Sequence, residues 1–506
     1  MTRRGWLVLL VLVLMAAPGL WVASSSSHEA LPAVGGPTAA GETGDTGEAR
    51  RTPWNAIVVV VDDMDDFTCA DAAAYLPRSA PWLVDQGRCF EDATAASPVC
   101  CPARAVISTG QLPHNNGVRR QNEAIRLVGT DTVQHDLAGA GVATYGVGKF
   151  LNGLNPGLIA SGEFDSGFEQ HDFWPNPSYY TYPLYDDEGE PYRPEEPVHT
   201  TVRAGENLRS FVAEQDDERP FYAYAAFFSP HDRTGGGPRG RRLPVPTPAN
   251  VGREVPPFAW QPERDTRDKL LPFRALEEGR AYFEAKQATR VRSLYDVDDQ
   301  MALTFAQLEE QGLLDTTMVL FTSDNGYALG ENGWHGKAVP YSASVDVPML
   351  AYVPTAMTER GVDDREVDLV DIAPTLYDLF DVEPAHLLDG HSLLSDYART
   401  RGRLLSFANE RSNFVLQESG YAPFRVPTWA ALRTKDHLLV EFYRSGRLLE
   451  REFYADPLDQ ENLLWQDLPR AERTALWQRI LPLVKDLRAM RTCAGTIEQG
   501  SPNPCP

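Results

Sequence analysis

An uninterrupted run of β-branched residues is the feature that most constrains the fold of this chain. Residues 56–61 read Ala-Ile-Val-Val-Val-Val, with no alternation of apolar and polar positions. A strand that is apolar on both faces is typical of a parallel sheet covered by helices, because a half-exposed strand alternates. The run ends directly in Asp62 and Asp63. The sequence therefore predicts a buried strand that delivers two carboxylates at its carboxyl end.

The same arrangement recurs three times along the chain. Apolar segments at 141–147, 221–228 and 317–322 each lead into polar residues. The residues that follow them are Gly148-Lys149, Ser229-Pro230-His231 and Ser323-Asp324-Asn325-Gly326. In open α/β sheets, sites form beyond the carboxyl ends of the strands. We therefore expect these side chains to converge on one crevice.

Helical spacing between the apolar segments indicates an α/β fold. The clearest stripe, which ends before a stop signal at Gly312, consists of Val291, Leu294, Val297, Met301, Phe305 and Leu308. Past about residue 390, short segments at 428–433, 437–443 and 448–454 indicate an antiparallel meander, followed by a helix at about 470–490. The prediction is a central, mostly parallel sheet flanked by helices, with a smaller C-terminal α+β subdomain that contains an antiparallel sheet.

Length and composition indicate a folded, exported protein. The 506 residues exceed one ordinary domain, and 42% of them are hydrophobic, which suffices for a sizeable core. Arg3 and Arg4 precede an apolar run and then small residues, as in a secretory signal peptide. An uncleaved membrane anchor is the alternative. In either case we expect the rest of the chain outside the cytoplasm, secreted or anchored at the cell surface.

These features divide the chain into five predicted segments. They are a signal peptide at 1–24, a flexible linker at 25–52, a large domain at 53–395, a C-terminal subdomain at 396–490 and a tail at 491–506. The linker prediction rests on a Gly-, Ala-, Thr- and Ser-rich composition with few large apolar residues.

The charge balance argues against nucleic acid as a partner. The chain has 47 Lys or Arg against 71 Asp or Glu, a formal net charge of −24. Phosphate binding requires a basic face, and no block of Lys or Arg supplies one. A membrane contact is expected only if the N-terminal segment is retained.

The cysteines also constrain the chemistry. The chain has six of them: Cys69, Cys89, Cys100, Cys101, Cys493 and Cys505. In an exported chain, pairing is the default expectation. We expect a bridge between Cys493 and Cys505 that closes the tail, with Cys69–Cys89 as a second pair. Neighbouring residues rarely form a disulfide with each other, so at least one residue of the pair at 100–101 needs another explanation.

The strand ends carry a candidate metal site. Asp62, Asp63, Asp324 and Asn325 offer hard oxygen donors, the ligands that Ca²⁺ or Mg²⁺ prefers over softer metals. The alternative is that each pair forms an ordinary turn at the end of a strand.

The segment between the two candidate ligand pairs resembles the signature of the sulfatase family. It reads Cys100-Cys101-Pro102-Ala103-Arg104, with Thr109-Gly110 following. The family signature is Cys-x-Pro-Ser-Arg followed by Thr-Gly, so Ala103 departs from the usual Ser. The resemblance implies that Cys100 is oxidised after translation to formylglycine by a formylglycine-generating enzyme. It would also explain the awkward cysteine pair, since Cys100 would no longer be a thiol.

Further motifs extend the resemblance from about residue 54 to 464, and they are closest to the N-acetylglucosamine-6-sulfatase-like group. In chain order they are Asp62-Asp63, Gly148-Lys149-Phe150-Leu151-Asn152, Ser229-Pro230-His231, Thr322-Ser323-Asp324-Asn325-Gly326-Tyr327, Gly336-Lys337, Asp371-Ile372-Ala373-Pro374-Thr375-Leu376 and Phe453-Tyr454-Ala455-Asp456-Pro457. The fold implied is the alkaline-phosphatase/sulfatase-like α/β fold.

The resemblance also implies roles for individual residues. The implied metal ligands are Asp62, Asp63, Cys100, Asp324 and Asn325. A hydrated formylglycine at position 100 would attack sulfur with one oxygen and expel sulfate with the other. Arg104 would hold the hydrate, Lys149 and Lys337 would bracket the sulfate oxygens, and His231 would donate a proton to the leaving oxygen.

One position departs from many sulfatases. They have a His two residues after the first Lys, where this chain has Leu151. His114 is the candidate replacement because it follows the segment that bears the nucleophile. The alternative is that His114 only caps or packs a turn. His335 is either a substrate contact or a surface residue.

Together the sequence predicts an exported, Ca²⁺-dependent sulfuric ester hydrolase, with Mg²⁺ as the alternative ion. The expected substrate is a sulfated small molecule or glycan, and most simply a sulfated sugar. One alternative is a phosphate or phosphonate monoester hydrolase that uses the same site. The other is a catalytically silent exported binding protein in which Cys100 stays unmodified.

Overall fold

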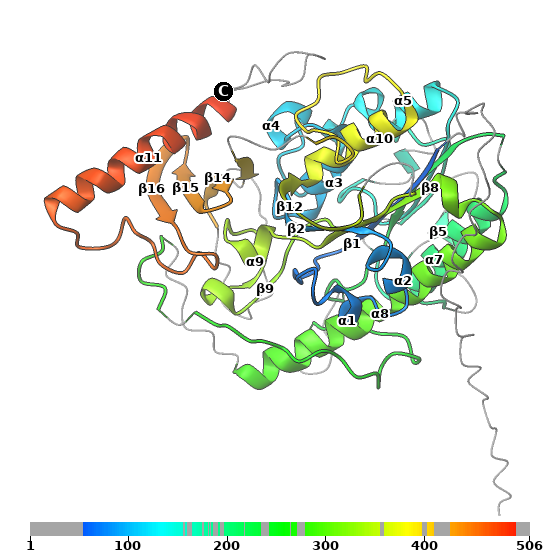
Figure 1. The fold of residues 1–506 in the computed structure, drawn as a ribbon, viewed down its shortest axis with the longest axis horizontal. Coiled ribbons are helices and arrows are strands. Elements are labelled where there is room, and N and C mark those ends of the chain that lie inside the picture. Colours follow the sequence, from blue (N-terminus) through cyan, green and yellow to red (C-terminus); the bar gives the residue numbers. More distant parts are fainter. Residues whose placement is uncertain are drawn as a thin grey trace, which may run out of the picture. The chain divides into compact units, whose positions relative to one another are not determined.

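The computed structural model describes residues 54–491, apart from several short internal gaps (Figure 1). The gaps are 155–156, 159–163, 175–176, 181, 183, 186–190, 193–196, 217, 234–241, 264, 271–278, 355–358, 397–401 and 409–425. The predicted signal peptide, the linker and the Cys493–Cys505 bridge therefore lie outside the described residues. None of the helices in the described part is long and apolar enough to cross a membrane.

An eight-stranded sheet forms the centre of the fold, in the order β12-β2-β11-β8-β1-β7-β3-β4. Only β11 runs antiparallel to its neighbours, so the prediction of a mostly parallel sheet is confirmed. The strands are β1 Asn55–Val61, β2 Arg88–Thr94, β3 Ala143–Gly148, β4 Gln170–Phe173, β7 Phe221–Ala226, β8 Thr317–Ser323, β11 Met349–Tyr352 and β12 Gly361–Asp368.

Helices cover both faces of this sheet (Figure 1). One layer contains α3 Cys100–Thr109, α4 Pro113–Asn116, α5 Val133–Gly139 and α10 Ile372–Phe380. The other contains α1 Ala72–Tyr75, α2 Ala80–Leu83, α7 Thr200–Ala213 and α8 Arg280–Glu310. Val58 and Val60 of β1 belong to the core under the first layer, whereas Ile57 and Val59 face α7 and α8. Burial on both sides explains why this strand shows no polar alternation.

The C-terminal segments form the predicted antiparallel meander. Its strands are β13 Arg403–Phe407, β14 Thr428–Thr434, β15 His437–Arg444 and β16 Arg447–Tyr454, and α11 Arg470–Met490 follows. One face of this sheet packs on α11 through residues such as Leu439 and Ile480. The opposite face, which includes Val440 and Phe442, packs on the chain segment around Trp334 and Tyr341. The C-terminal sheet thus supports the loop that carries Lys337.

Shorter elements complete the described part of the chain. They are β5 Leu184–Tyr185, β6 Pro191–Tyr192, β9 Ala328–Leu329, β10 His335–Gly336 and α9 Ser342–Val345, together with several 3-10 turns. The predicted pairing of Cys69 with Cys89 is confirmed as a disulfide. Cys100 and Cys101 are both buried free thiols.

Candidate active site

The sheet register brings the two candidate ligand pairs together. β1 and β8 are parallel neighbours, and Val61 lies opposite Ser323. The residues that follow each strand, Asp62-Asp63 and Asp324-Asn325, therefore emerge side by side. Asp63 adopts a left-handed backbone conformation with φ of 62°. This sharp bend is tolerated better by Asp than by most residues, and it lets consecutive carboxylates face the same site.

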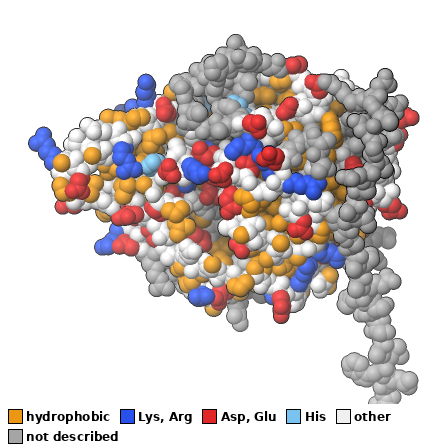
Figure 2. Space-filling view, in the orientation of Figure 1, with side chains coloured by type: hydrophobic (Ala, Val, Ile, Leu, Met, Phe, Trp, Pro, Cys, Tyr) orange, Lys and Arg blue, Asp and Glu red, His pale blue; other side chains and the backbone are white. Residues whose placement is uncertain are grey.

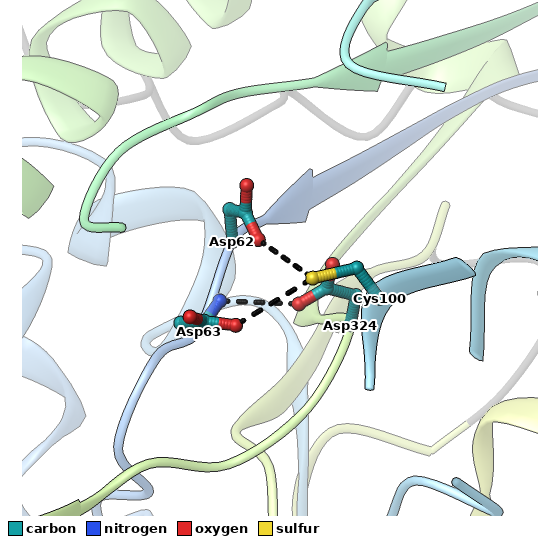
Figure 3. Close-up of side chains that lie close together, drawn as sticks. All are labelled: Asp62, Asp63, Cys100 and Asp324. Atoms are coloured by element: carbon teal, nitrogen blue, oxygen red, sulfur yellow. Dashed lines mark hydrogen bonds between the residues drawn. The ribbon is translucent and has the colours of Figure 1, made fainter. Parts of the chain in front are cut away.

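Four side chains form a compact, fully buried cluster (Figure 3). One ligand atom each from Asp62, Asp63, Cys100 and Asp324 lies within 4.8 Å of the others. The Cys100 Sγ atom is 3.4 Å from Oδ1 of Asp62 and 3.8 Å from Oδ1 of Asp63. The backbone N–H of Asp63 donates to Oδ1 of Asp324 at 3.1 Å. The strand ends and the nucleophile candidate therefore meet at one point.

Cys100 lies at the N-terminal end of a helix that also carries Arg104. Cys100 is the first residue of α3, so the helix N-terminus, with its unpaired N–H groups and positive dipole end, lies at the cluster. Arg104 follows four residues later, on the same face of the helix. One helix therefore delivers both the nucleophile candidate and a cation.

Three buried cations face the three buried carboxylates. Arg104 donates through Nε to Asp324 Oδ2 at 2.8 Å and through a terminal nitrogen to the Lys149 carbonyl oxygen at 2.6 Å. Lys149 Nζ lies 2.5 Å from Asp62 Oδ2. Lys337 Nζ contacts Asp63 and is 2.9 Å from Cys100 Sγ. Since the formal charges of these six groups cancel, the site can accept a divalent cation together with an anionic ester.

A glycine allows Lys149 to reach the cluster. Gly148, the last residue of β3, has φ of 91°. A Cβ atom at this position would collide with the carbonyl oxygen of Ala226 on the neighbouring strand β7. Only glycine therefore permits this turn, which directs the following lysine toward Asp62.

The cations set the ionisation of the carboxylates. Burial opposes ionisation of Asp62, but the charges of Lys149 and His231 keep its pKa below the ordinary value. Burial likewise opposes ionisation of Asp63, but the charges of Lys337, His231 and Lys149 together lower the pKa of Asp63. The pKa of Asp324 is raised, because the cost of burial exceeds the attraction of Arg104.

The thiol of Cys100 is a poor nucleophile in this setting. Burial and the charge of Asp324 raise its pKa well above the ordinary value, despite the attraction of Lys149 and Lys337. Thiols attack as thiolates, and this environment disfavours the thiolate. At this position the cost of burial therefore outweighs the attraction of the two lysines.

The residues present fit a hard divalent cation. Asp63 Oδ2 and Asn325 Oδ1 are buried and accept no hydrogen bond from the described residues. Carboxylate and amide oxygens are the ligands that Ca²⁺ and Mg²⁺ prefer, and unpaired buried oxygens are costly unless a ligand satisfies them. Asp62, Asp63, Asp324 and Asn325 are the side chains that could hold such an ion.

His231 lies at the edge of this cluster, as the strand pattern predicts. Its Nε2 atom is 3.4 Å from Asp63 Oδ2, and its Nδ1 atom is 2.6 Å from the carbonyl oxygen of Asp232. Its side chain is 19% exposed, so it can meet a ligand that enters from solvent.

His114 is not brought to the site. It lies in α4, beyond the C-terminal end of α3, whereas Cys100 opens α3. A ten-residue helix spans about 15 Å, so this helix separates the two residues. The prediction that His114 replaces the histidine missing at Leu151 is therefore wrong. Leu151 itself is buried in the core.

His335 is buried rather than at the surface. Its ring contacts those of Tyr282, Phe283 and Tyr327. Burial and the nearby charges of Lys286 and Arg290 lower its pKa well below the ordinary value. The interpretation of His335 as a surface residue is thus wrong.

Two residues that sequence reasoning missed also contact the site. Gln121 accepts a hydrogen bond from the backbone N–H of Cys101 at 3.1 Å. Arg290 of α8 donates to the carbonyl oxygen of Asp63. Neither residue stands in a recognisable pattern, because a lone glutamine and a helix arginine usually face solvent.

Comparisons with known proteins place this architecture in a family. Fold and site together define an α/β protein with a buried cluster of carboxylates and cations around Cys100 at the end of its central sheet. Residues 54–382 match the sulfatase family, and residues 330–486 match the family described as N-sulphoglucosamine sulphohydrolase, C-terminal. The first match spans well over half of the chain. The chain therefore belongs to the sulfatase family.

Curated relatives are distant. An extracellular sulfatase SULF-1 homolog of Drosophila melanogaster is 27% identical over 393 residues, which is 74% of this chain and 34% of that protein. N-acetylglucosamine-6-O-sulfatase of Bacteroides thetaiotaomicron is 23% identical and covers 82% of this chain and 83% of its own length. The chain spans between about a third and two thirds of the length of the first three such relatives.

Solved structures share the fold. A protein in complex with its substrate D-glucosamine-2-N,6-O-disulfate has a TM-score of 0.64 and 20% identity, over 87% of this chain and 98% of that one. The phosphonate monoester hydrolase of Silicibacter pomeroyi has a TM-score of 0.63 and 20% identity, over 87% and 96%. These likenesses confirm the predicted alkaline-phosphatase/sulfatase-like fold.

Proposed function

We propose that this protein hydrolyses sulfate monoesters at the cluster around Cys100. The observation that carries the proposal is the convergence of Cys100, the three buried cations and the four oxygen-bearing side chains at the end of the central sheet. Such a site neutralises a tetrahedral anion and presents residue 100 to it. Membership of the sulfatase family supports sulfate as the group transferred.

Sulfate ester hydrolysis at this site would need two groups that the gene does not encode, a formylglycine and a divalent cation. Oxidation of Cys100 to formylglycine supplies an aldehyde whose hydrate carries two oxygens, one to attack sulfur and one to release sulfate. A Ca²⁺ ion, or Mg²⁺, held by Asp62, Asp63, Asp324 and Asn325 supplies Lewis-acid stabilisation of negative charge.

The remaining steps belong to the chain's own residues. Arg104 holds Asp324 and the backbone at Lys149, so it fixes the geometry around residue 100. Lys149 and Lys337 approach from two sides and neutralise the sulfate oxygens as charge grows in the transition state. His231, with Nε2 facing the cluster, donates a proton to the leaving alcohol oxygen.

A sulfated sugar is the proposed substrate class. Relatives named for N-acetylglucosamine 6-sulfate hydrolysis and a structural neighbour bound to a disulfated glucosamine support it. On the face drawn in Figure 2, Lys and Arg side chains lie scattered among Asp and Glu. With a net charge of −24, this distribution favours a small sulfated glycan over a long polyanion.

Export and maturation are part of the same proposal. The N-terminal pattern at 1–24 and the extracellular relatives support secretion or anchoring at the cell surface. The Cys69–Cys89 disulfide fits an oxidising compartment. A formylglycine-generating enzyme would be the partner during maturation.

Phosphonate or phosphate monoester hydrolysis is the second candidate. Two phosphonate monoester hydrolases share the fold, with TM-scores of 0.63 and 0.64. Their identity to this chain is 20% or less, so they support this alternative only weakly.

Turnover assays combined with mass spectrometry test the proposal. Purified protein is assayed on 4-nitrophenyl sulfate, 4-nitrophenyl phosphate and a phenyl phosphonate ester, beside Cys100→Ala. We expect sulfate turnover that disappears in the variant, and a residue-100 peptide whose mass shows an aldehyde in place of the thiol. A preference for the phosphonate would establish the second candidate. An intact thiol in active protein would remove the mechanism, and an intact thiol in inactive protein would indicate a silent binding protein.

A further inference from the structure

Helix α8 carries two buried cations that the catalytic cluster does not include. Lys286 and Arg290 are 1% and 0% exposed, and they lie one turn apart on the same face of the helix. Both face the loops that follow β1 and β7. Lys and Arg are rarely buried so completely unless they hold specific partners, so their contacts call for an explanation.

Arg290 ties the two catalytic loops together. Its Nε donates to the carboxylate of Asp65 at 2.8 Å, and one terminal nitrogen donates to the carbonyl oxygen of Asp63. The other terminal nitrogen is 3.4 Å from the carbonyl oxygen of Pro230, the residue before His231. A single side chain thus connects a candidate metal ligand to the loop that carries the proton donor.

Lys286 holds the other side of that loop. Its Nζ lies 2.5 Å from Oδ2 of Asp232 and 2.8 Å from the hydroxyl oxygen of Tyr327. The Tyr327 hydroxyl also donates to the same Asp232 oxygen at 3.1 Å. The Asp232 side chain is therefore fixed by two donors from elements distant in the sequence.

The position of Asp232 also determines the orientation of His231, because the backbone carbonyl of Asp232 contacts the His231 ring. The carbonyl oxygen of Asp232 lies 2.6 Å from Nδ1 of His231, so Nδ1 carries hydrogen and donates to it. The imidazole also stacks on Phe228, with ring centroids 4.9 Å apart. Nε2 is left facing the catalytic cluster, 3.4 Å from Oδ2 of Asp63.

The ion pair of Lys286 and Asp232 carries a cost in folding free energy that a purely structural role does not explain. Oδ1 of Asp232 is buried and has no hydrogen-bond partner among the described residues. An unpaired buried carboxylate oxygen destabilises the fold, and buried ion pairs often contribute less than apolar residues of the same size. Stability alone therefore does not account for this pair, whereas placement of the Asp232 carbonyl does.

We propose that Lys286 is a positioning residue for the leaving-group step: by holding Asp232 it orients His231 with Nε2 toward the scissile oxygen. The inference rests on the proposed function. In that step one oxygen of the hydrated residue 100 would bond to sulfur while the bond between sulfur and the ester oxygen breaks, and the electron pair of the broken bond goes to the ester oxygen. The proton on His231 Nε2 moves to the same oxygen, and the alcohol leaves.

A series of aryl sulfates tests this role, because good leaving groups need no proton donor. The variant Lys286→Met is compared with wild type on 4-nitrophenyl sulfate and on phenyl sulfate, whose leaving phenol is the more basic. We expect kcat to fall less than about 3-fold on the first ester and about 100-fold on the second, the range general acids provide. Arg292→Met is the matched control, because Arg292 lies on the same helix and donates to the Arg253 carbonyl instead.

A double variant separates positioning from folding. Lys286→Met removes the cation that contacts the buried Asp232 carboxylate, so the thermal midpoint of the variant should fall. Adding Asp232→Asn should restore the midpoint while the greater loss on phenyl sulfate persists. Equal losses on both esters, no loss on either, or recovery of phenyl sulfate turnover in the double variant would overturn the inference. Failure of wild type on both esters would overturn the proposed function instead.

Discussion

The Nζ atom of Lys337 lies 2.9 Å from the Sγ atom of Cys100, and it contacts Asp63 at the same time. One ammonium group thus contacts both the nucleophile candidate and a candidate metal ligand. The backbone around it is unusual, since Ala338 has φ of 77°, a left-handed conformation that costs energy in a non-glycine residue. The surrounding structure must therefore hold this lysine in place.

Removal of the Lys337 charge should abolish turnover. In Lys337→Met we expect kcat on 4-nitrophenyl sulfate to fall at least about 100-fold, because a preorganised cation at the developing charge is lost. Circular dichroism should show an unchanged fold. Lys435→Met, at a largely exposed lysine, is the control and should keep wild-type activity. Activity within a few-fold of wild type in Lys337→Met would contradict the role.

Removal of divalent cations should inactivate and destabilise the protein. After treatment with EDTA we expect turnover to stop, and Ca²⁺ at about 100 times its Kd should raise the free energy of unfolding by about 3 kcal/mol. Asp324→Asn should weaken this response, whereas Asp315→Asn, at an exposed carboxylate just before β8, should not. An EDTA-treated protein with full activity would argue against a metal centre.

The C-terminal sheet should influence catalysis through Trp429. Its indole N–H donates to the carbonyl oxygen of Ala338 at 3.0 Å, and Trp334 donates to the carbonyl of Lys337 at 2.9 Å. In Trp429→Phe the Ala338 carbonyl loses that donor, which should cost about 1–3 kcal/mol of stability.

Because this contact supports the backbone at Lys337, kcat should fall as well, while KM changes little. Trp477→Phe, on α11, removes an indole N–H elsewhere in the C-terminal region and serves as the control. A stability loss in Trp429→Phe with unchanged kcat would show that the sheet does not act through Lys337.

Glu452 should make stability depend on pH. Burial raises its pKa to about 7, although the Leu270 N–H and the hydroxyls of Tyr341 and Tyr454 donate to it. A raised pKa means that the folded state favours the protonated form. The resulting stabilisation is complete below the pKa of the unfolded chain and is lost as pH rises toward 7.

Glu452→Gln should remove this dependence. Between pH 4 and 8, denaturant titrations should show the free energy of unfolding of wild type falling relative to the variant, by as much as about 3 kcal/mol. Parallel pH profiles for the two proteins would show that folding does not raise the pKa of Glu452.

The sequence predicts the elements whose signals are local. Strand β1 follows from a run of β-branched residues and β8 from an apolar segment, and α11 and the meander β14–β16 follow from turn residues and periodicity. The juxtaposition of Asp62 with Asp324 follows as well, because parallel neighbours end at the same edge of a sheet.

Residues that depend on packing between distant elements could not be predicted in this way. Lys286 and Arg290 resemble solvent-facing charges on a helix until the loops after β1 and β7 are placed against them. His114 is close to Cys100 in the sequence, but the direction of α3 carries it away. Trp429 and Ala338 are far apart in the sequence, and no sequence pattern predicts the contact between them.

The complete burial of Cys100 has a consequence for biosynthesis. The buried site around Cys100 includes Asp324. Asp324 follows β8, so it is translated long after α3. Once β8 docks beside β1, no macromolecule can reach the sulfur. An oxidising enzyme would therefore have to act on the nascent or newly translocated polypeptide, and molecules that collapse too soon would stay permanently unconverted. The yield of active protein would therefore depend on the rate of Cys100 oxidation relative to the rate of folding.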